Sequence, residues 1–146
     1  MLFYLPGVQM LQNDATQRGL AEVVAGVDRV RQILSDRGIS LVFLPLPDKE
    51  DIYQELLPES LRPSEPPPFL EKLVNMLRDQ GINTVDLYRP FRSAAPAFLQ
   101  SRKENDSLYF LDDTHWNGQG VSLAVDETLW RLMELKLISD ATESRP

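Results

Sequence analysis

The stretch LDDTHWNGQG, residues 111–120, contains the residue types of an acid–base site. It holds two carboxylates and the single histidine of the chain. In an extended segment, side chains two positions apart project to the same side, so the Asp113 carboxylate can bond the His115 imidazole. A bond at Nδ1 fixes the tautomer and leaves Nε2 free to act as a general base toward a hydroxyl. The spacing therefore predicts an orienting carboxylate, Asp113, and a catalytic base, His115.

Two other interpretations of the same residues stay open. Asp112 or Asp113 could simply cap a turn and leave His115 as an ordinary surface residue. Aspartate and histidine are also common metal ligands. With one histidine and no cysteine in the chain, further ligands would have to be carboxylates, which argues against zinc. We therefore expect neither a metal nor a cofactor.

The residues after the pair are expected to shape its surroundings. Trp116 can pack against the backbone and shield the pair from water, and it is a candidate substrate-binding residue. Asn117 can cap the helix that starts at Gly118. Gly118 and Gly120 allow a close approach of the backbone to another group, such as a ligand. The tryptophan and the two glycines are also common in ordinary packing and turns.

The rest of the chain alternates between predicted helices and strands. Apolar residues at helical spacing predict helices over 17–37, from 69 to 77 and over 118–137, and Gly38 and Gly81 stand where helices end. Residues 89–106 are expected to form a short helix and a charged loop. Apolar, partly β-branched runs predict strands at 39–46 and 82–87, the first covered on both faces, with shorter ones at 3–9 and 107–111.

This order of elements predicts an α/β fold. A three-layer sandwich with a mainly parallel sheet is the natural arrangement for helices that alternate with buried strands. Only 39–46 and 82–87 are convincing core strands, which is few for 146 residues. We therefore expect the sheet to be incomplete.

Two further side chains, Lys49 and Asp86, lie near predicted strand ends, where open α/β sheets place their sites, and Tyr53 follows Lys49. Lys49 could attract the carboxylate of a uronate sugar; alternatively it forms a structural ion pair with Asp48 or Glu50, or is solvated. Tyr53 is expected to pack with its hydroxyl in water. Asp86 is expected to cap the next helix rather than to take part in catalysis.

Composition excludes several classes of function. The net charge of −7 argues against binding to nucleic acid or to anionic lipid. No apolar run is long enough to form a transmembrane segment, and the start of the chain has no signal peptide pattern. The absence of cysteine rules out disulfides and cysteine nucleophiles.

Three segments together resemble a known family. YFLDDTHWNGQG (109–120) is similar to the D-x-H-W motif of the SGNH hydrolase-like alginate O-acetyltransferases of the AlgX and AlgJ type. LVFLPLPDKEDIYQELLP (41–58) resembles that family's strand with a Pro-Asp-Lys segment, and LFYLPG resembles the end of its first hairpin. GINTVDLYRPF fits its next strand, and all matches occur in family order.

The resemblance implies a flavodoxin-like α/β domain that acetylates an exopolysaccharide with a Ser-His-Asp triad. Asp113 would be the orienting carboxylate and His115 the base. The candidate substrate contacts, Lys49 and Trp116, rest on their positions in the sequence and not on the resemblance. It further implies a polysaccharide acceptor, an acetyl donor, a membrane-bound acyltransferase partner, and a periplasmic or cell-envelope location.

The chain departs from the family at the nucleophile, because it contains no Gly-Asp-Ser motif. The serines after His115 are Ser122, Ser139 and Ser144, and none follows a predicted strand. We therefore expect residues 1–138 to be a partial domain that is truncated at both ends, residues 139–146 to be a disordered tail, and the fragment to be inactive. Two rival functions are a carbohydrate esterase of the same fold and a non-catalytic polysaccharide-binding or scaffold domain.

Overall fold

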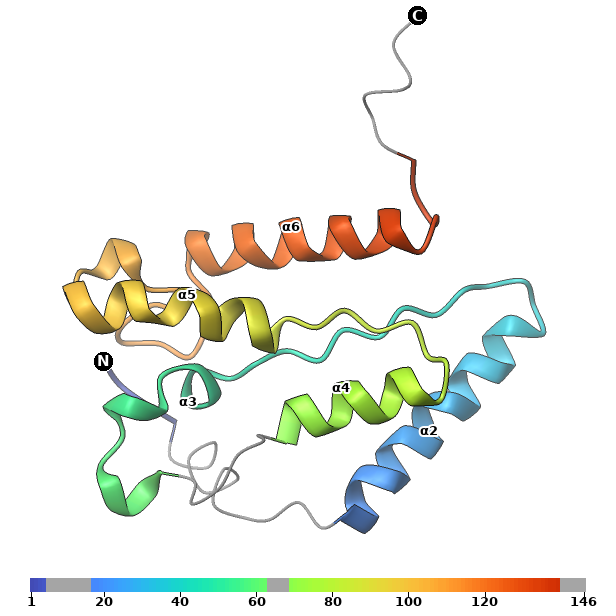
Figure 1. Ribbon diagram of the computed structural model, residues 1–146, viewed down its shortest axis with the longest axis horizontal. Helices are drawn as coiled ribbons and strands as arrows, with labels where there is room; N and C mark the ends of the chain where they lie inside the picture. The colour runs from blue at the N-terminus through green and yellow to red at the C-terminus, as the bar shows by residue number, and fades with distance from the viewer. Residues whose placement is uncertain (5–16, 63–68, 140–146) are drawn as a thin grey trace, which may run out of the picture.

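The computed structural model describes residues 1–4, 17–62 and 69–139, and most of these residues are helical (Figure 1). Its α-helices are α2 (Gln17–Ser35), α3 (Lys49–Ile52), α4 (Phe69–Asp79), α5 (Tyr88–Ser101) and α6 (Gly118–Glu134). Short 3₁₀ helices occupy Gln54–Leu56, Glu59–Leu61 and Glu104–Asp106. None of the helices described here is both long and apolar enough to cross a membrane. The predicted tail beyond Ser139 and most of the strand predicted at 3–9 lie outside the described residues.

The prediction of a three-layer α/β sandwich with a mainly parallel sheet was wrong. The described residues contain no β-sheet. Residues 39–46 and 82–87 do run side by side, but they share a single parallel bridge between Phe43 and Thr84. Phe43 N–H donates to the Asn83 carbonyl at 2.8 Å, and Val85 N–H donates to the Phe43 carbonyl at 3.0 Å.

No further strand of the described residues extends either outer edge of this pair. On one edge, the Thr84 carbonyl accepts hydrogen bonds from Arg131 at 3.2 Å and from Arg78 at 3.4 Å, where a third strand would otherwise bind. On the other edge, the main-chain groups of Val42 and Leu44 make no hydrogen bond within the described part of the chain. Leu44 is 37% exposed, so the expectation that 39–46 is covered on both faces was also wrong.

The helix ends follow the expected turn chemistry. Gly38 has a φ of +72° and Gly81 a φ of +70°, a region where a glycine avoids the strain of a side chain. Gly38 N–H donates to the Ser35 carbonyl at 2.9 Å, which closes α2 as predicted. In contrast to the short helix expected after residue 89, α5 has 14 residues.

Two apolar clusters hold the elements together. α5 and α6 lie on one side of the extended segments, and α2 and α4 lie on the other (Figure 1). The larger cluster joins α3, α5, α6 and residues 108–109, with Phe91 at 0% exposure. The smaller one joins α2 and α4 through Leu20, Val24, Leu73, Leu77 and Ile82. Val42 packs toward the first cluster and Phe43 toward the second, so the extended segments separate two layers of helices.

Candidate functional site

The decapeptide forms the tip of a short hairpin-like turn that leads into α6. Tyr109 and Trp116 form an isolated antiparallel bridge. Phe110 N–H donates to the His115 carbonyl at 3.1 Å, and Asn117 N–H donates to the Leu108 carbonyl at 3.0 Å. Residues 112–115 at the tip are exposed and form bends rather than an extended strand. The geometry assumed for the Asp113–His115 spacing was therefore incorrect.

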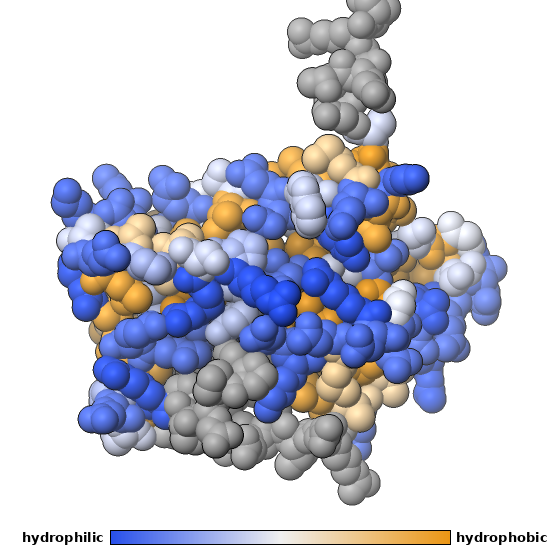
Figure 2. All heavy atoms as spheres, in the orientation of Figure 1, coloured by the Kyte–Doolittle hydropathy of each residue, from blue (hydrophilic) through white to orange (hydrophobic). Residues whose placement is uncertain are grey.

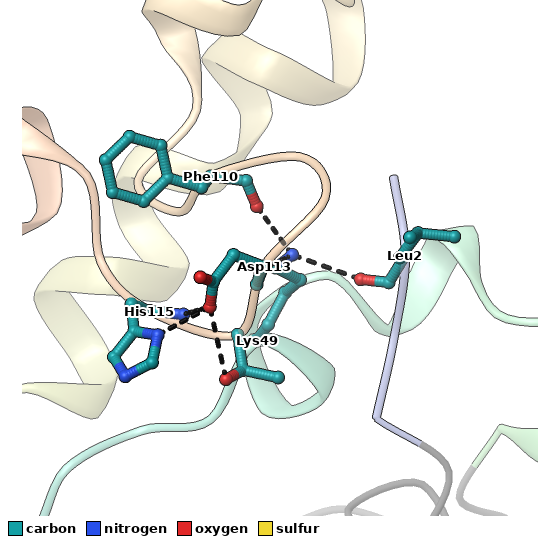
Figure 3. A network of polar contacts seen from close by, with 6 residues as sticks. Leu2, Lys49, Phe110, Asp113 and His115 are labelled. Atoms are coloured by element: carbon teal, nitrogen blue, oxygen red, sulfur yellow. Dashed lines mark hydrogen bonds and ion pairs between the residues drawn. The ribbon is translucent and has the colours of Figure 1, made fainter.

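The structure nevertheless brings Asp113 and His115 together (Figure 3). Asp113 Oδ1 lies 2.5 Å from His115 Nδ1 and also accepts the His115 main-chain N–H at 2.9 Å. The hydrogen bond from the His115 main-chain N–H has the largest effect and the bond to the imidazole the next largest, and both hold the pKa of the Asp113 carboxyl below its usual range. The side chains of His115 and Asp113 are 81% and 50% exposed, so both carboxylate and imidazole can meet a second molecule.

Asp113 makes two of the contacts that the sequence suggested. Its carboxylate caps the turn by accepting the main-chain N–H two residues ahead, and it also binds the imidazole. Within the described residues, His115 Nε2 has no hydrogen-bond partner, and it points away from Asp113 (Figure 3). The arrangement therefore holds one ring nitrogen and leaves the other available for proton transfer.

Lys49 lies directly beneath this loop, at the start of α3 (Figure 3). The residue is 1% exposed. Its ammonium donates to the carbonyls of Phe110 at 2.6 Å and Leu2 at 3.0 Å, and also to the carbonyl of Asp113. It is thus neither solvated nor hydrogen-bonded to the Asp48 or Glu50 carboxylate, which were the two structural alternatives.

Two opposing effects act on the pKa of Lys49. Burial lowers the pKa of the Lys49 ammonium, whereas the nearby carboxylates of Glu50, Asp113 and Asp112 raise it. A lysine ammonium has three hydrogens to donate, and here three main-chain carbonyls accept them. A substrate contact by Lys49 stays a prediction, and it would require one of these bonds to be given up.

The residues after His115 position α6 against the hairpin. Asn117 Oδ1 accepts the N–H groups of Gln119 at 2.9 Å and Gly120 at 3.1 Å, which confirms it as the cap of α6. A Cβ on Gly120 would lie 2.2 Å from the Leu108 carbonyl, so the close approach is to the protein's own backbone. The half-buried Trp116 stacks at a tilt on Phe91, with ring centroids 5.1 Å apart.

The two remaining predicted residues have structural roles. Asp86 accepts the Arg89 N–H at 3.3 Å in the first turn of α5, as expected. Tyr53 is fully buried, and its hydroxyl accepts the Leu108 N–H at 2.9 Å, so the expectation of a hydroxyl in water was wrong.

Sequence reasoning missed how deeply the charged residues of α3 are buried. Lys49, Glu50 and Asp51 are all buried, and burial raises the pKa of Asp51 to about 6. The Asp51 carboxylate accepts the Asp48 N–H at 2.9 Å. An acidic residue three positions after an N-cap aspartate is the available signal for this local arrangement.

Metal binding was the other interpretation of this site. In the ranges that the structure describes, no group of three or more carboxylate or histidine side chains is placed to hold a metal ion.

Comparisons with known proteins identify the family. A family model described as the SGNH hydrolase-like domain of the acetyltransferase AlgX matches residues 2–145. The structure is similar to the O-acetyltransferase domain of Pseudomonas putida AlgJ, with a TM-score of 0.61 and 22% sequence identity. This similarity covers 95% of the present chain and 44% of the AlgJ chain. Curated proteins provide no significant match. The chain thus belongs to the family of AlgX-type SGNH hydrolase-like acetyltransferase domains.

Proposed function

We propose that this chain supplies the Asp–His part of a site that transfers acetyl groups to a polysaccharide such as alginate. Asp113 orients the imidazole, and His115 is the general base. The observation that carries the proposal is the 2.5 Å contact between Asp113 Oδ1 and His115 Nδ1, with an exposed imidazole. Family membership supports acetyl transfer as the reaction class.

The chemistry follows from the two nitrogens of the imidazole. Nε2 takes the proton of a nucleophilic hydroxyl while the oxygen of that hydroxyl attacks the acetyl carbonyl of a donor ester. The imidazolium, stabilised by Asp113, returns the proton to the leaving alcohol of the donor. A sugar hydroxyl then attacks the acetyl-enzyme with the same base, which forms the acetylated sugar and restores the first hydroxyl.

The scheme also needs a nucleophilic hydroxyl, and the sequence contains no Gly-Asp-Ser motif to supply it. Ser122 lies exposed on α6, and neither Ser122 nor Ser139 hydrogen-bonds His115 within the described structure. The chain covers less than half of the AlgJ chain, so a large part of that relative has no counterpart in the present sequence.

The location and partners proposed for this protein derive from the family. We place the reaction in the periplasm or cell envelope, with a polysaccharide acceptor. A membrane-bound acyltransferase would supply the acetyl donor. The exposed Asp113–His115 pair is compatible with a large polymeric acceptor, because it lies at the tip of a loop.

The proposal is tested on the longest protein that contains this sequence, with an acetyl ester as donor and an oligosaccharide of uronate sugars as acceptor. His115→Ala should lower acetyl transfer by about 10⁶-fold and Asp113→Asn by about 10⁴-fold, because the first removes the base and the second removes only the carboxylate that orients it. Asp112→Asn is the matched control, because Asp112 is the adjacent exposed carboxylate, and it should keep nearly full activity. Turnover that is unaffected by His115→Ala would refute the assignment.

The acceptor also separates transfer from hydrolysis. A transferase should yield the acetylated oligosaccharide, whereas an esterase should release acetate equally well without the acceptor. The 146-residue chain alone should turn over the ester no faster than its His115→Ala variant, because it supplies the base without the nucleophile.

A further inference from the structure

We propose that Lys49 is a positioning residue, whose ammonium holds the loop of Asp113 and His115 in the conformation that joins carboxylate and imidazole. The catalytic meaning of this role rests on the function proposed above. The positioning itself is a statement about this chain and can be tested without acetyl transfer.

The first argument is the placement of the Lys49 ammonium. Through three main-chain carbonyls it joins two segments that are remote in sequence from Lys49: that of Leu2 and the loop of Phe110 and Asp113 (Figure 3). A charged group with 1% exposure is retained in a fold only where its lost hydration is replaced. Three carbonyl oxygens provide that replacement, and each carries the partial negative charge that an ammonium prefers.

The second argument is the choice of carbonyls. Phe110 lies at the start of the turn and Asp113 lies at its tip, so one nitrogen gathers both and closes the loop between them. The Leu2 N–H also donates to the Leu111 carbonyl at 2.7 Å, which ties the N-terminal segment to the same loop. These bonds substitute for the regular secondary structure that residues 111–114 lack.

The third argument links this anchor to the imidazole. Lys49 fixes the main chain of Asp113, and the Asp113 side chain then binds both the N–H and Nδ1 of His115. The pair is mostly exposed, so little packing holds it in place. The main-chain anchor beneath Asp113 is therefore the contact that decides where the carboxylate points.

The tautomer of the neutral imidazole provides a direct readout. Nδ1–H is the form that Asp113 can accept, whereas an unrestrained histidine favours Nε2–H. The ring ¹⁵N shifts of the single histidine report this without ambiguity. We expect the unmodified chain to be predominantly Nδ1–H and Lys49→Met to be predominantly Nε2–H, with the Asp113→Asn variant as the reference for a lost pair.

Arg92→Met is the matched control. The Arg92 guanidinium also donates to a main-chain carbonyl of α3, that of Ile52, and pairs with Glu55 at 2.7 Å, but it does not touch the loop. The Arg92→Met variant should lower the stability of the fold without changing the tautomer of His115. A folded Lys49→Met protein that keeps the Nδ1–H form would overturn the proposal, as would an equal loss of that form in Arg92→Met.

A second measurement covers the case in which Lys49→Met does not fold. In the unmodified chain, one of the four lysine ammonium groups should exchange its protons with water at least about tenfold more slowly than the others, because its three hydrogens are bound. That ammonium should also show nuclear Overhauser contacts to residues 110–113. Four ammonium groups that all exchange at the rate of free lysine would contradict the proposal.

Discussion

The loop that carries Asp113 and His115 and the helix that follows it are supported in opposite ways. The loop is exposed, yet its main chain is bound from below by a buried ammonium and by the N-terminal segment. α6 is a regular helix, but its buried residues are only Gly120 and Ala124. Polar bonds thus anchor an irregular segment, whereas an apolar helix has little to pack against.

α6 leaves apolar side chains exposed along most of its length. Figure 2 shows apolar surface over its C-terminal half. These exposed residues are Val121, Val125, Leu129, Trp130 and Met133. Exposed apolar side chains contribute little to stability because they lose little contact with water on folding. The comparison therefore predicts that removal of a large side chain lowers the free energy of unfolding strongly near the loop and only slightly on the outer side of α6.

Removal of a large aromatic side chain should show the greatest contrast. Phe91 is fully buried between Tyr109 and Trp116, whereas Trp130 is 57% exposed. Phe91→Ala should lower the free energy of unfolding by about 3–5 kcal/mol through lost burial and a cavity. Trp130→Ala should cost less than about 1 kcal/mol. Urea unfolding followed by circular dichroism measures both, and equal costs would show that Trp130 is covered in solution.

A pair of glycines at the start of α6 tests the contact between the two regions. A Cβ on Gly120 would collide with the Leu108 carbonyl, which is itself bound by the Asn117 N–H. Gly120→Ala should therefore lower stability by roughly 1–3 kcal/mol. Gly118→Ala is the control, since nothing lies within 4 Å of its added methyl group. If the two variants have the same thermal midpoint, α6 does not pack against Leu108 as described.

How far the sequence predicted this molecule depends on whether a feature is local. Periodicity located α2, α4 and α6, and glycines with positive φ mark the ends of α2 and α4. The Asn117 cap is likewise a short-range bond. The sheet was not predicted correctly, because a strand pattern in 39–46 does not reveal whether a neighbour is present to pair with it.

The candidate site shows the same division. Asp113 and His115 are two residues apart, so their contact needed only a local turn and was predicted. The Lys49 contacts reach 47, 61 and 64 residues along the chain to Leu2, Phe110 and Asp113, and no local pattern encodes them. A charged residue after a strand also suits a solvated site, which is why burial of Lys49 was not anticipated.

Asp51 gives the buried polar region a dependence on pH. Its pKa is raised to about 6 by burial, so between the unfolded value of about 3.9 and about 6 the folded state alone retains the proton. Stability contributed by this proton is present at low pH and is lost as the pH rises through about 6. Between about pH 5 and about pH 7.5, the loss should be about 1.4 kcal/mol.

Asp51→Asn isolates this contribution. The amide oxygen still accepts the Asp48 N–H but does not titrate, so the variant should lack this part of the pH dependence. Urea unfolding of both proteins at the two pH values gives the difference. Parallel stability curves for the two proteins would mean that Asp51 is not buried as described.

Asp113→Asn should have the smallest effect on the fold. Its carboxylate is exposed, and a surface ion pair contributes little to stability, so the unfolding transition should coincide with that of the unmodified chain. The asparagine still accepts the His115 N–H in the turn, but it no longer enforces the Nδ1–H tautomer. A thermal melt and the ring ¹⁵N shifts on the same sample therefore separate the two roles of this residue. If the melt shifted and the tautomer stayed, Asp113 would be a turn residue, and the exposed loop would stabilise the fold rather than prepare a base.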